Sequence, residues 1–154
     1  MKIRQMAFES LDYKDWSTMQ EKNFLAMNTT ILAFIGDSVY EVHVRNFVIK
    51  AGETSPEKLH RSAVRYVRAE AQAQALKVLI PELTEEELAL VKRARNKKIS
   101  SKPKNADPVE YKMATAFEAL MGALYLRQDV DRLSFLADRT IEIINQSSKA
   151  EVLK

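Results

Sequence analysis

The sequence has no cysteine, only three glycines and four prolines, and no long apolar run. Without cysteine the chain has no disulfides, no thiolate metal site and no cysteine nucleophile, and its two histidines are too few for a typical zinc site. No stretch approaches the roughly 20 apolar residues of a membrane span, and the N-terminus lacks the apolar core of a signal peptide. A cytoplasmic protein fits these absences best.

The bulk composition is that of one globular domain. A chain of 154 residues with 46% hydrophobic residues can form one sizeable core, and its net charge of +3 identifies no partner. The scarcity of glycine and proline favours helices over a many-stranded sheet. We therefore predict an all-α domain over residues 28–147, with a lead-in at 1–27 and a frayed polar tail at 148–154.

The first long helix is predicted from its apolar spacing. It begins at Asn28 or Thr29, both suited to an N-cap, and it ends at Gly52. Apolar residues recur in it at spacings of three to five, which indicates one amphipathic face. That face is expected to comprise Ile31, Ile35, Val39, Val42 and Phe47.

Cap residues mark where the later helices begin and end. Ser55 and Pro56 provide an N-cap and a first-turn proline, and Pro81 ends the Ala- and Gln-rich segment that follows. Thr84 with Glu87 three residues later forms a capping box. We expect helices over about 55–80 with a bend near 68, and over about 84–95, 107–127 and 130–147.

Two acidic residues, Asp37 and Glu118, lie inside strongly apolar helices, where an unpaired buried charge is costly. Small residues flank both acids on the same helix faces, so the two helices could pack closely there. The carboxylates would then converge and hold a divalent cation, with Mg²⁺ as the default for oxygen ligands. Such a cation could activate water for phosphodiester hydrolysis.

A plainer interpretation remains open for these acids, since each could simply solvate a helix edge or pair with a nearby cation. Glu41 illustrates it, because Arg45 four residues later is a favourable partner. His43 and His60 are isolated, without an obvious acidic residue to orient them, and we expect structural or surface roles for both.

Residues 92–104 form a basic segment without a single acid. Charge runs often form a solvated loop, but seven cations in this segment also suit a surface that binds phosphates. The candidate binding residues are Lys92, Arg93, Arg95, Lys97, Lys98, Lys102 and Lys104.

Two segments resemble motifs of the ribonuclease III family. FIGDSVYEV at 34–42 is similar to the helix signature centred on a Gly-Asp pair, here Gly36 and Asp37. ATAFEALMGALYL at 114–126 resembles the second helix motif, with Glu118 as its glutamate. The resemblance covers about 28–140 and implies the ribonuclease III endonuclease-domain fold, with Asp37 and Glu118 as the metal-binding catalytic pair.

The chain also departs from the pattern of larger ribonuclease III enzymes. Three further acids of that pattern fall on Thr30, Ala33 and Thr115. These losses, the segments RARNKK at 93–98 and PKN at 103–105, and the lack of room for a double-stranded RNA-binding domain resemble the Mini-III branch.

That branch implies a Mg²⁺-dependent homodimer with one catalytic centre per subunit, which leaves short 3′ overhangs. Its implied substrate is double-stranded precursor of the large-subunit (23S) ribosomal RNA, with a ribosomal protein as a possible accessory. The missing acids leave the number of metal ions open. The rival hypothesis is a non-catalytic, double-stranded RNA-binding or ribosome-associated module, although such a scaffold has no evident need for Asp37 and Glu118.

Overall fold

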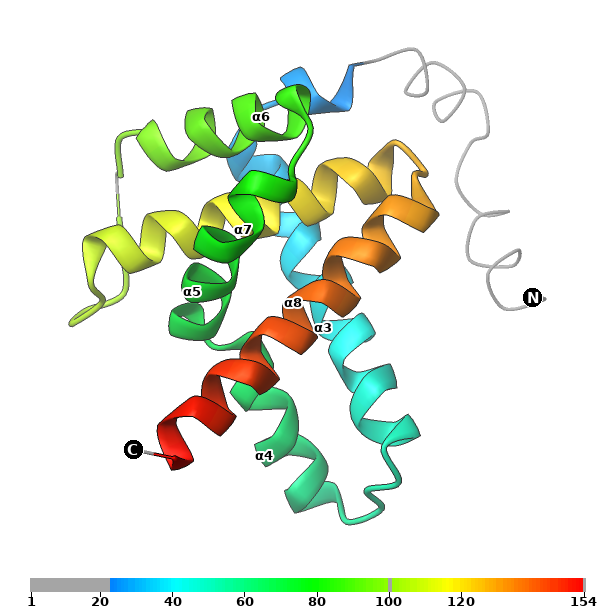
Figure 1. Ribbon diagram of the computed structural model, residues 1–154. Helices are drawn as coiled ribbons and strands as arrows, with labels where there is room; N and C mark the ends of the chain where they lie inside the picture. Colours follow the sequence, from blue (N-terminus) through cyan, green and yellow to red (C-terminus); the bar gives the residue numbers. More distant parts are fainter. Residues whose placement is uncertain (1–22, 100, 154) are drawn as a thin grey trace.

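The computed structural model describes residues 23–99 and 101–153 (Figure 1). These residues contain no strand, which confirms the predicted all-α fold, and none of their helices is long and apolar enough to cross a membrane. The elements are η1 (Phe24–Ala26), α3 (Thr29–Lys50), α4 (Pro56–Val67), α5 (Ala69–Leu79), η2 (Ile80–Glu82), α6 (Glu85–Asn96), α7 (Pro108–Leu126) and α8 (Val130–Val152).

Helix α7 is the centre of the domain. It packs against α3, α5, α6 and α8, and in Figure 1 it crosses the upper half of the molecule beneath α6. Most of its length is buried, as expected of a helix that is apolar on nearly every side. Its buried residues are Met113, Ala114, Ala116, Phe117, Ala119, Leu120, Met121, Gly122, Ala123 and Leu124.

The helix starts expected from cap residues are confirmed. Asn28 accepts a hydrogen bond from the Thr30 backbone N–H at 2.9 Å. Thr84 and Glu87 make both bonds of the capping box. The Asp107 carboxylate accepts from two backbone N–H groups at the start of α7, and the chain bends at Arg68 between α4 and α5. These starts are predictable because each cap is a contact between residues close in sequence.

The expected core face of α3 is wrong. Ile31 and Val42 are more than half exposed, and Ile35 and Val39 are only partly buried. The helix is apolar almost all round, so spacing alone did not select the face that meets α7. The residues that α3 buries are Thr29, Leu32, Ala33, Gly36, Tyr40, Val44 and Val48.

The two ends of the chain differ from the expected lead-in and tail. Helix α8 continues to Val152, so residues 148–152 are helical and not a frayed tail. Ser148 donates its hydroxyl to the Ile144 carbonyl at 3.1 Å, and Lys, Ala and Glu in these turns are good helix formers. Most of the lead-in at 1–27 lies outside the described residues, while Phe24 and Leu25 are buried in η1.

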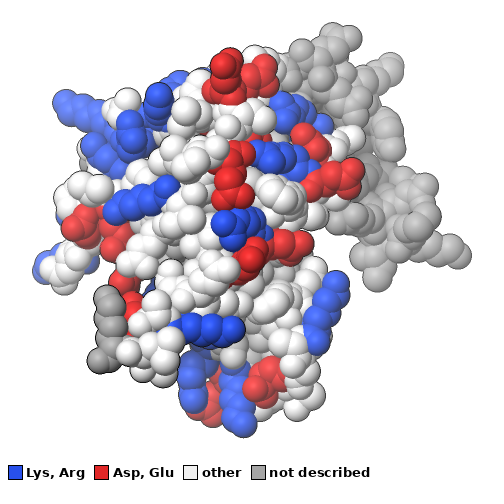
Figure 2. Space-filling model, viewed as in Figure 1, with Lys and Arg blue, Asp and Glu red and all other residues white. Residues whose placement is uncertain are grey.

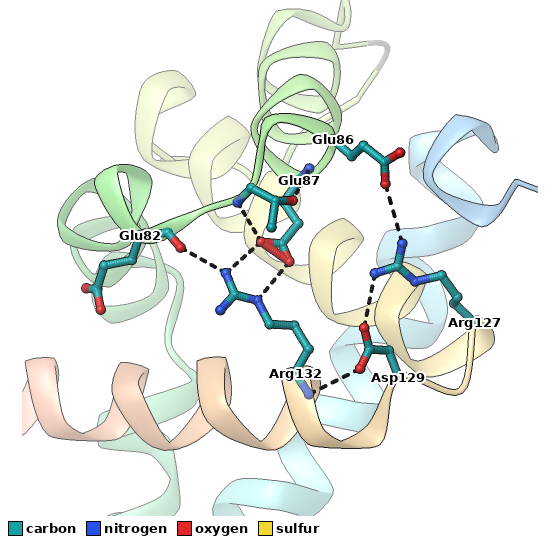
Figure 3. Close-up of polar contacts among 7 residues, drawn as sticks. Glu82, Glu86, Glu87, Arg127, Asp129 and Arg132 are labelled. Atoms are coloured by element: carbon teal, nitrogen blue, oxygen red, sulfur yellow. Dashed lines mark hydrogen bonds and ion pairs between the residues drawn. The ribbon is translucent and has the colours of Figure 1, made fainter.

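A buried ion pair fastens α8 to the start of α6 (Figure 3). The Glu87 carboxylate is 1% exposed and accepts two hydrogen bonds from Arg132, at 2.7 and 3.0 Å. Burial alone would raise the pKa of Glu87, but the bonds from Arg132 and Thr84 outweigh it and lower the pKa. Glu87 is therefore a fully compensated structural carboxylate.

Candidate active site

Helices α3 and α7 approach each other most closely at two glycines. A methyl group on Gly36 would overlap the backbone carbonyl of Glu118, and one on Gly122 would overlap the carbonyl of Leu32. Any side chain at either position would force the two backbones apart. The close packing predicted from the small residues is thus present, and it sets Asp37 beside the turn of α7 that carries Glu118.

The two carboxylates at this crossing influence each other. Burial is the main cause that raises the pKa of Glu118 to about 7, and the negative charge of Asp37 adds to the rise. Asp37 is exposed to solvent, whereas Glu118 is largely buried. Among the described residues neither carboxylate forms an ion pair, so pairing with a nearby cation does not explain them.

The side-chain amide of Gln72 is a third polar group near this crossing, and it was not identified from the sequence. Gln72 of α5 is 1% exposed, and its side-chain amide favours the charged form of Glu118, which opposes the rise of that pKa. Gln72 Nε2 also donates to the Val67 carbonyl at 2.7 Å. Gln72 Oε1 has no partner among the described residues. The available signal was that Gln72 occupies the apolar stripe of α5, three, four and seven residues before Ala75, Leu76 and Leu79.

These groups fit a hard divalent cation such as Mg²⁺. The described residues contain no cluster of three or more His, Cys, Asp or Glu side chains, so a zinc-type ligand set is not found there. Mg²⁺ commonly takes one or two protein carboxylates and keeps several waters. Asp37 and Glu118, two carboxylates without an ion pair among the described residues, match that requirement in donor type and charge.

Thr30, Ala33 and Thr115, which stand at the positions of the missing acids, supply no carboxylate to the site. Thr115 lies one turn before Glu118 and donates its hydroxyl to the Tyr111 carbonyl at 2.9 Å. The Thr30 hydroxyl accepts a hydrogen bond from Lys97 Nζ at 2.6 Å. A cation of the protein thus occupies one place where the larger enzymes carry a carboxylate.

Part of the basic segment is occupied with contacts inside the protein. Arg93 donates to the carbonyls of Leu25 and Met27, both at 2.8 Å, and so fastens η1 to α6. Lys97 also donates to the Asn28 side chain at 3.0 Å. These two cations therefore have a structural role in addition to any role toward a ligand.

The remaining cations of the segment make fewer contacts inside the protein. Lys92, Lys98 and Lys104 are exposed, and no polar contact of theirs is found in the described part of the chain. Figure 2 shows Lys and Arg side chains gathered at the upper left, over the C-terminal half of α6. Arg95 is half-buried and donates to Asn96 at 3.5 Å, and exposed Lys102 donates to the Ala106 carbonyl at 2.9 Å.

A cavity of about 170 Å³ lies beside the basic segment. Its walls come from the start of α3, the end of α6 with the segment after it, and the first turns of α7. Asp37 and Glu118 do not line it, although Thr115 of its wall lies one turn before Glu118 on α7. The lining residues are Thr29, Thr30, Ala94, Lys97, Lys98, Ile99, Ser101, Tyr111, Lys112 and Thr115.

One expectation for the histidines is corrected. His43 does have an acidic partner, since its Nε2 lies 2.8 Å from Asp138 Oδ1 of α8. The contact joins residues 95 positions apart, which no local pattern could indicate. His60 is exposed, and Arg45 pairs with Glu41 at 2.8 Å as expected.

Comparison with known proteins gives the family of the chain. Residues 30–129, a range that includes Asp37 and Glu118, match the ribonuclease III domain family. The chain belongs to the ribonuclease III family, a class of endoribonucleases. Its curated relatives place it in the Mini-ribonuclease 3 group of that family, as the missing acids and the segments RARNKK and PKN indicated.

Three of these relatives illustrate the similarity. The Mini-ribonuclease 3 of Brevibacillus brevis is 46% identical over 121 residues, which are 79% of this chain and 90% of the relative. Those of Enterococcus faecalis and Symbiobacterium thermophilum are 38% and 43% identical, each over 83% of this chain and 98% of the relative. A crystal structure of a Fusobacterium nucleatum protein has a TM-score of 0.68 at 30% identity, covering 79% of this chain and 98% of that one.

Proposed function

We propose that this chain cuts double-stranded RNA by Mg²⁺-dependent phosphodiester hydrolysis, with Asp37 and Glu118 as its metal-binding catalytic pair. The observation that carries the proposal is the pair of unpaired carboxylates at the Gly36 crossing. A carboxylate held in a mostly buried position without a protein cation is unfavourable unless another charge compensates it. A divalent cation supplies that charge.

In this proposal Asp37 and Glu118 hold the cation at the edge of the domain. When bound, the cation would activate water for attack and offset the charge that builds on the phosphate oxygens. The low-polarity surroundings of Glu118 strengthen every electrostatic interaction made there. Asp37, being exposed, lies where a phosphodiester can reach it.

The proposal assigns RNA binding to the basic segment. A-form RNA is read mainly through its shape, phosphates and 2′-hydroxyls, so exposed lysines suit it better than a base-reading helix. Changing Lys97, Lys98, Lys102 and Lys104 to Ala should weaken duplex binding and reduce its salt slope by about 0.9 for each phosphate that is no longer neutralised. An unaltered slope would remove the segment from the binding surface.

We further propose that the enzyme acts as a homodimer through a groove between α3, α7 and α8. The groove has a volume of about 360 Å³ and a largely apolar lining that includes Ile35, Val39 and Leu133. Phe34, on the same helix, is 82% exposed, although a monomer gains nothing from exposing a phenyl ring. Phe34→Glu should turn a dimer into a monomer in light scattering. A wild-type monomer would contradict the proposal.

The proposed substrate is precursor of the large-subunit ribosomal RNA, which would place the enzyme in the cytoplasm. This part rests on membership of the Mini-ribonuclease 3 group. A ribosomal protein that presents the duplex would compensate for the small binding surface. Cleavage of precursor RNA with and without bound ribosomal proteins tests this part.

The decisive experiment incubates the purified protein with a labelled RNA duplex and Mg²⁺, beside EDTA and Asp37→Asn controls. Cleavage by the wild type with Mg²⁺, and by neither control, is the expected result. Intact duplex and intact precursor ribosomal RNA, together with a salt-sensitive complex, would instead support a non-catalytic RNA-binding module.

A further inference from the structure

The amide of Gln72 is satisfied on one side only. Its Nε2 donates to the Val67 carbonyl at 2.7 Å, which closes the junction between α4 and α5. Its Oε1, in a side chain that is 1% exposed, accepts nothing among the described residues. Buried carbonyl oxygens are almost always hydrogen-bonded, because a missing bond costs free energy that folding must offset.

A structural role alone does not account for an amide at this position. The neighbouring positions of the same stripe are Ala75, Leu76 and Leu79, all fully buried. A leucine in place of Gln72 would fill the stripe and would lose only the bond to the Val67 carbonyl. The amide, however, also favours the charged form of the Glu118 carboxyl, which belongs to another helix.

We infer that Gln72 is a positioning residue of the metal centre, whose buried amide keeps the Glu118 carboxylate in the orientation that the cation needs. The inference rests on the proposed function. An amide NH₂ group has two N–H donors, so Gln72 can serve the Val67 carbonyl and the Glu118 carboxylate together. Groups that hold metal ligands from behind in this way set their orientation and the affinity for the ion.

The test compares Gln72→Leu with Gln74→Met, a change of the same residue type at an exposed position of α5. Calorimetry without RNA measures Mg²⁺ binding, and cleavage at varied Mg²⁺ and duplex concentrations measures kcat and KM. We expect Gln72→Leu to weaken Mg²⁺ binding about 10-fold or more, as changes behind metal ligands do. Its kcat should recover at high Mg²⁺ while KM for the duplex stays unchanged, and Gln74→Met should match the wild type.

Two results would overturn the inference. One is wild-type Mg²⁺ binding and a wild-type Mg²⁺ midpoint in Gln72→Leu. The other is a variant that melts earlier and loses activity at every Mg²⁺ concentration without a change in Mg²⁺ affinity, which is the behaviour of a helix-junction clamp. Gln72→Met, which keeps the side-chain length, takes the place of the leucine variant if that one does not fold.

Failure of the proposed function gives a different result. A wild-type protein that binds no Mg²⁺ and whose cleavage survives Asp37→Asn would remove the metal centre and Gln72 with it. If the wild type binds Mg²⁺ and depends on Asp37 while Gln72→Leu behaves normally, only the role of Gln72 is wrong.

Discussion

Glu87, which is buried, and Glu118, which is partly buried, are glutamates on neighbouring helices with opposite surroundings. Glu87 accepts two bonds from Arg132 and one from the Thr84 backbone, and its pKa is lowered. Glu118 faces another carboxylate, has only the amide of Gln72 to favour its charge, and its pKa is raised to about 7. The same side chain is thus compensated in one place and left uncompensated in the other.

Under the proposed function, this difference separates a structural acid from a metal-binding one. Where an ion pair serves the fold, the chain supplies both charges, as Figure 3 shows for Glu87 and Arg132. At the α3–α7 crossing the chain supplies two negative charges and no cation among the described residues. A glutamate with a raised pKa beside a second carboxylate is the kind of group that a bound ligand completes, which is the basis of the proposed metal site.

The largest effect should come from removing a charge at the uncompensated site. Asp37→Asn and Glu118→Gln should each reduce single-turnover cleavage of duplex RNA on the order of 1000-fold, because a catalytic metal contributes several kcal/mol and each 1.4 kcal/mol is tenfold in rate. Glu87→Gln, as the matched change at the compensated site, should leave cleavage by folded protein near the wild-type rate. Retained activity in either site variant would exclude that residue from the mechanism.

The opposite pattern is expected when the cation of the structural pair is removed. Arg132→Met leaves Glu87 buried without its partner, so the free energy of unfolding should fall by roughly 3 kcal/mol. Urea denaturation at pH 7 measures this loss. A loss below about 1 kcal/mol would show that the pair behaves as a surface ion pair. It would then contradict the contrast between a compensated Glu87 and an uncompensated Glu118.

The two glutamates should also respond to pH in opposite directions in metal-free protein. The pKa of Glu118 is about 7 in the folded protein, against an ordinary value of 4.5. Its negative charge therefore destabilises the fold by the full amount above pH 7, and this destabilisation disappears as the pH falls from 7 to 4.5. Glu118→Gln should therefore be more stable than the wild type by about 1 to 3 kcal/mol at pH 8, since each pKa unit is worth about 1.4 kcal/mol and residual solvent screening reduces the total.

Glu87 provides the contrast in the same titration. Its pKa is lowered in the fold, so its stabilising charge is fully present above pH 4.5 and is lost as pH falls through the lowered value. The stability advantage of the wild type over Glu87→Gln should accordingly persist from pH 8 to pH 5. Equal pH profiles of Glu87→Gln and Glu118→Gln, measured by thermal melting in EDTA, would contradict both assignments.

The smallest effect is expected at the outer part of the network in Figure 3. Arg127 contacts Glu86 at 3.6 Å and Asp129 at 3.2 Å, and all three side chains are more than a third exposed. Arg127→Gln should change the free energy of unfolding by less than about 1 kcal/mol. Urea denaturation beside Arg132→Met gives the comparison, and equal losses would show that burial does not separate the two arginines.

The elements of the fold were predictable because their signals are local. Thr84 and Glu87 meet across three residues, and Asp107 caps the two N–H groups that follow it, so their contacts are written in short stretches of sequence. The buried face of α3 was not predictable in this way, since Ile31 is as apolar as Leu32. Only packing against the small residues of α7 determines that Leu32 is buried.

The candidate site was predictable in part. Asp37 and Glu118 were found because an acid is out of place in an apolar helix, and Gly36 and Gly122 indicated the close approach. The partners that come from other helices could not be found locally. His43 meets Asp138 across 95 residues, and the dual position of Gln72 depends on how α5 lies against α7.

The most direct test of the account is calorimetric titration of Mg²⁺ into RNA-free protein at pH 8, for the wild type, Asp37→Asn, Glu118→Gln and Glu87→Gln. We predict binding in the wild type and in Glu87→Gln, and its loss in the two variants at the α3–α7 crossing. Mg²⁺ binding that persists unchanged in Asp37→Asn and Glu118→Gln would contradict the account, because the uncompensated carboxylates would then not be the metal site.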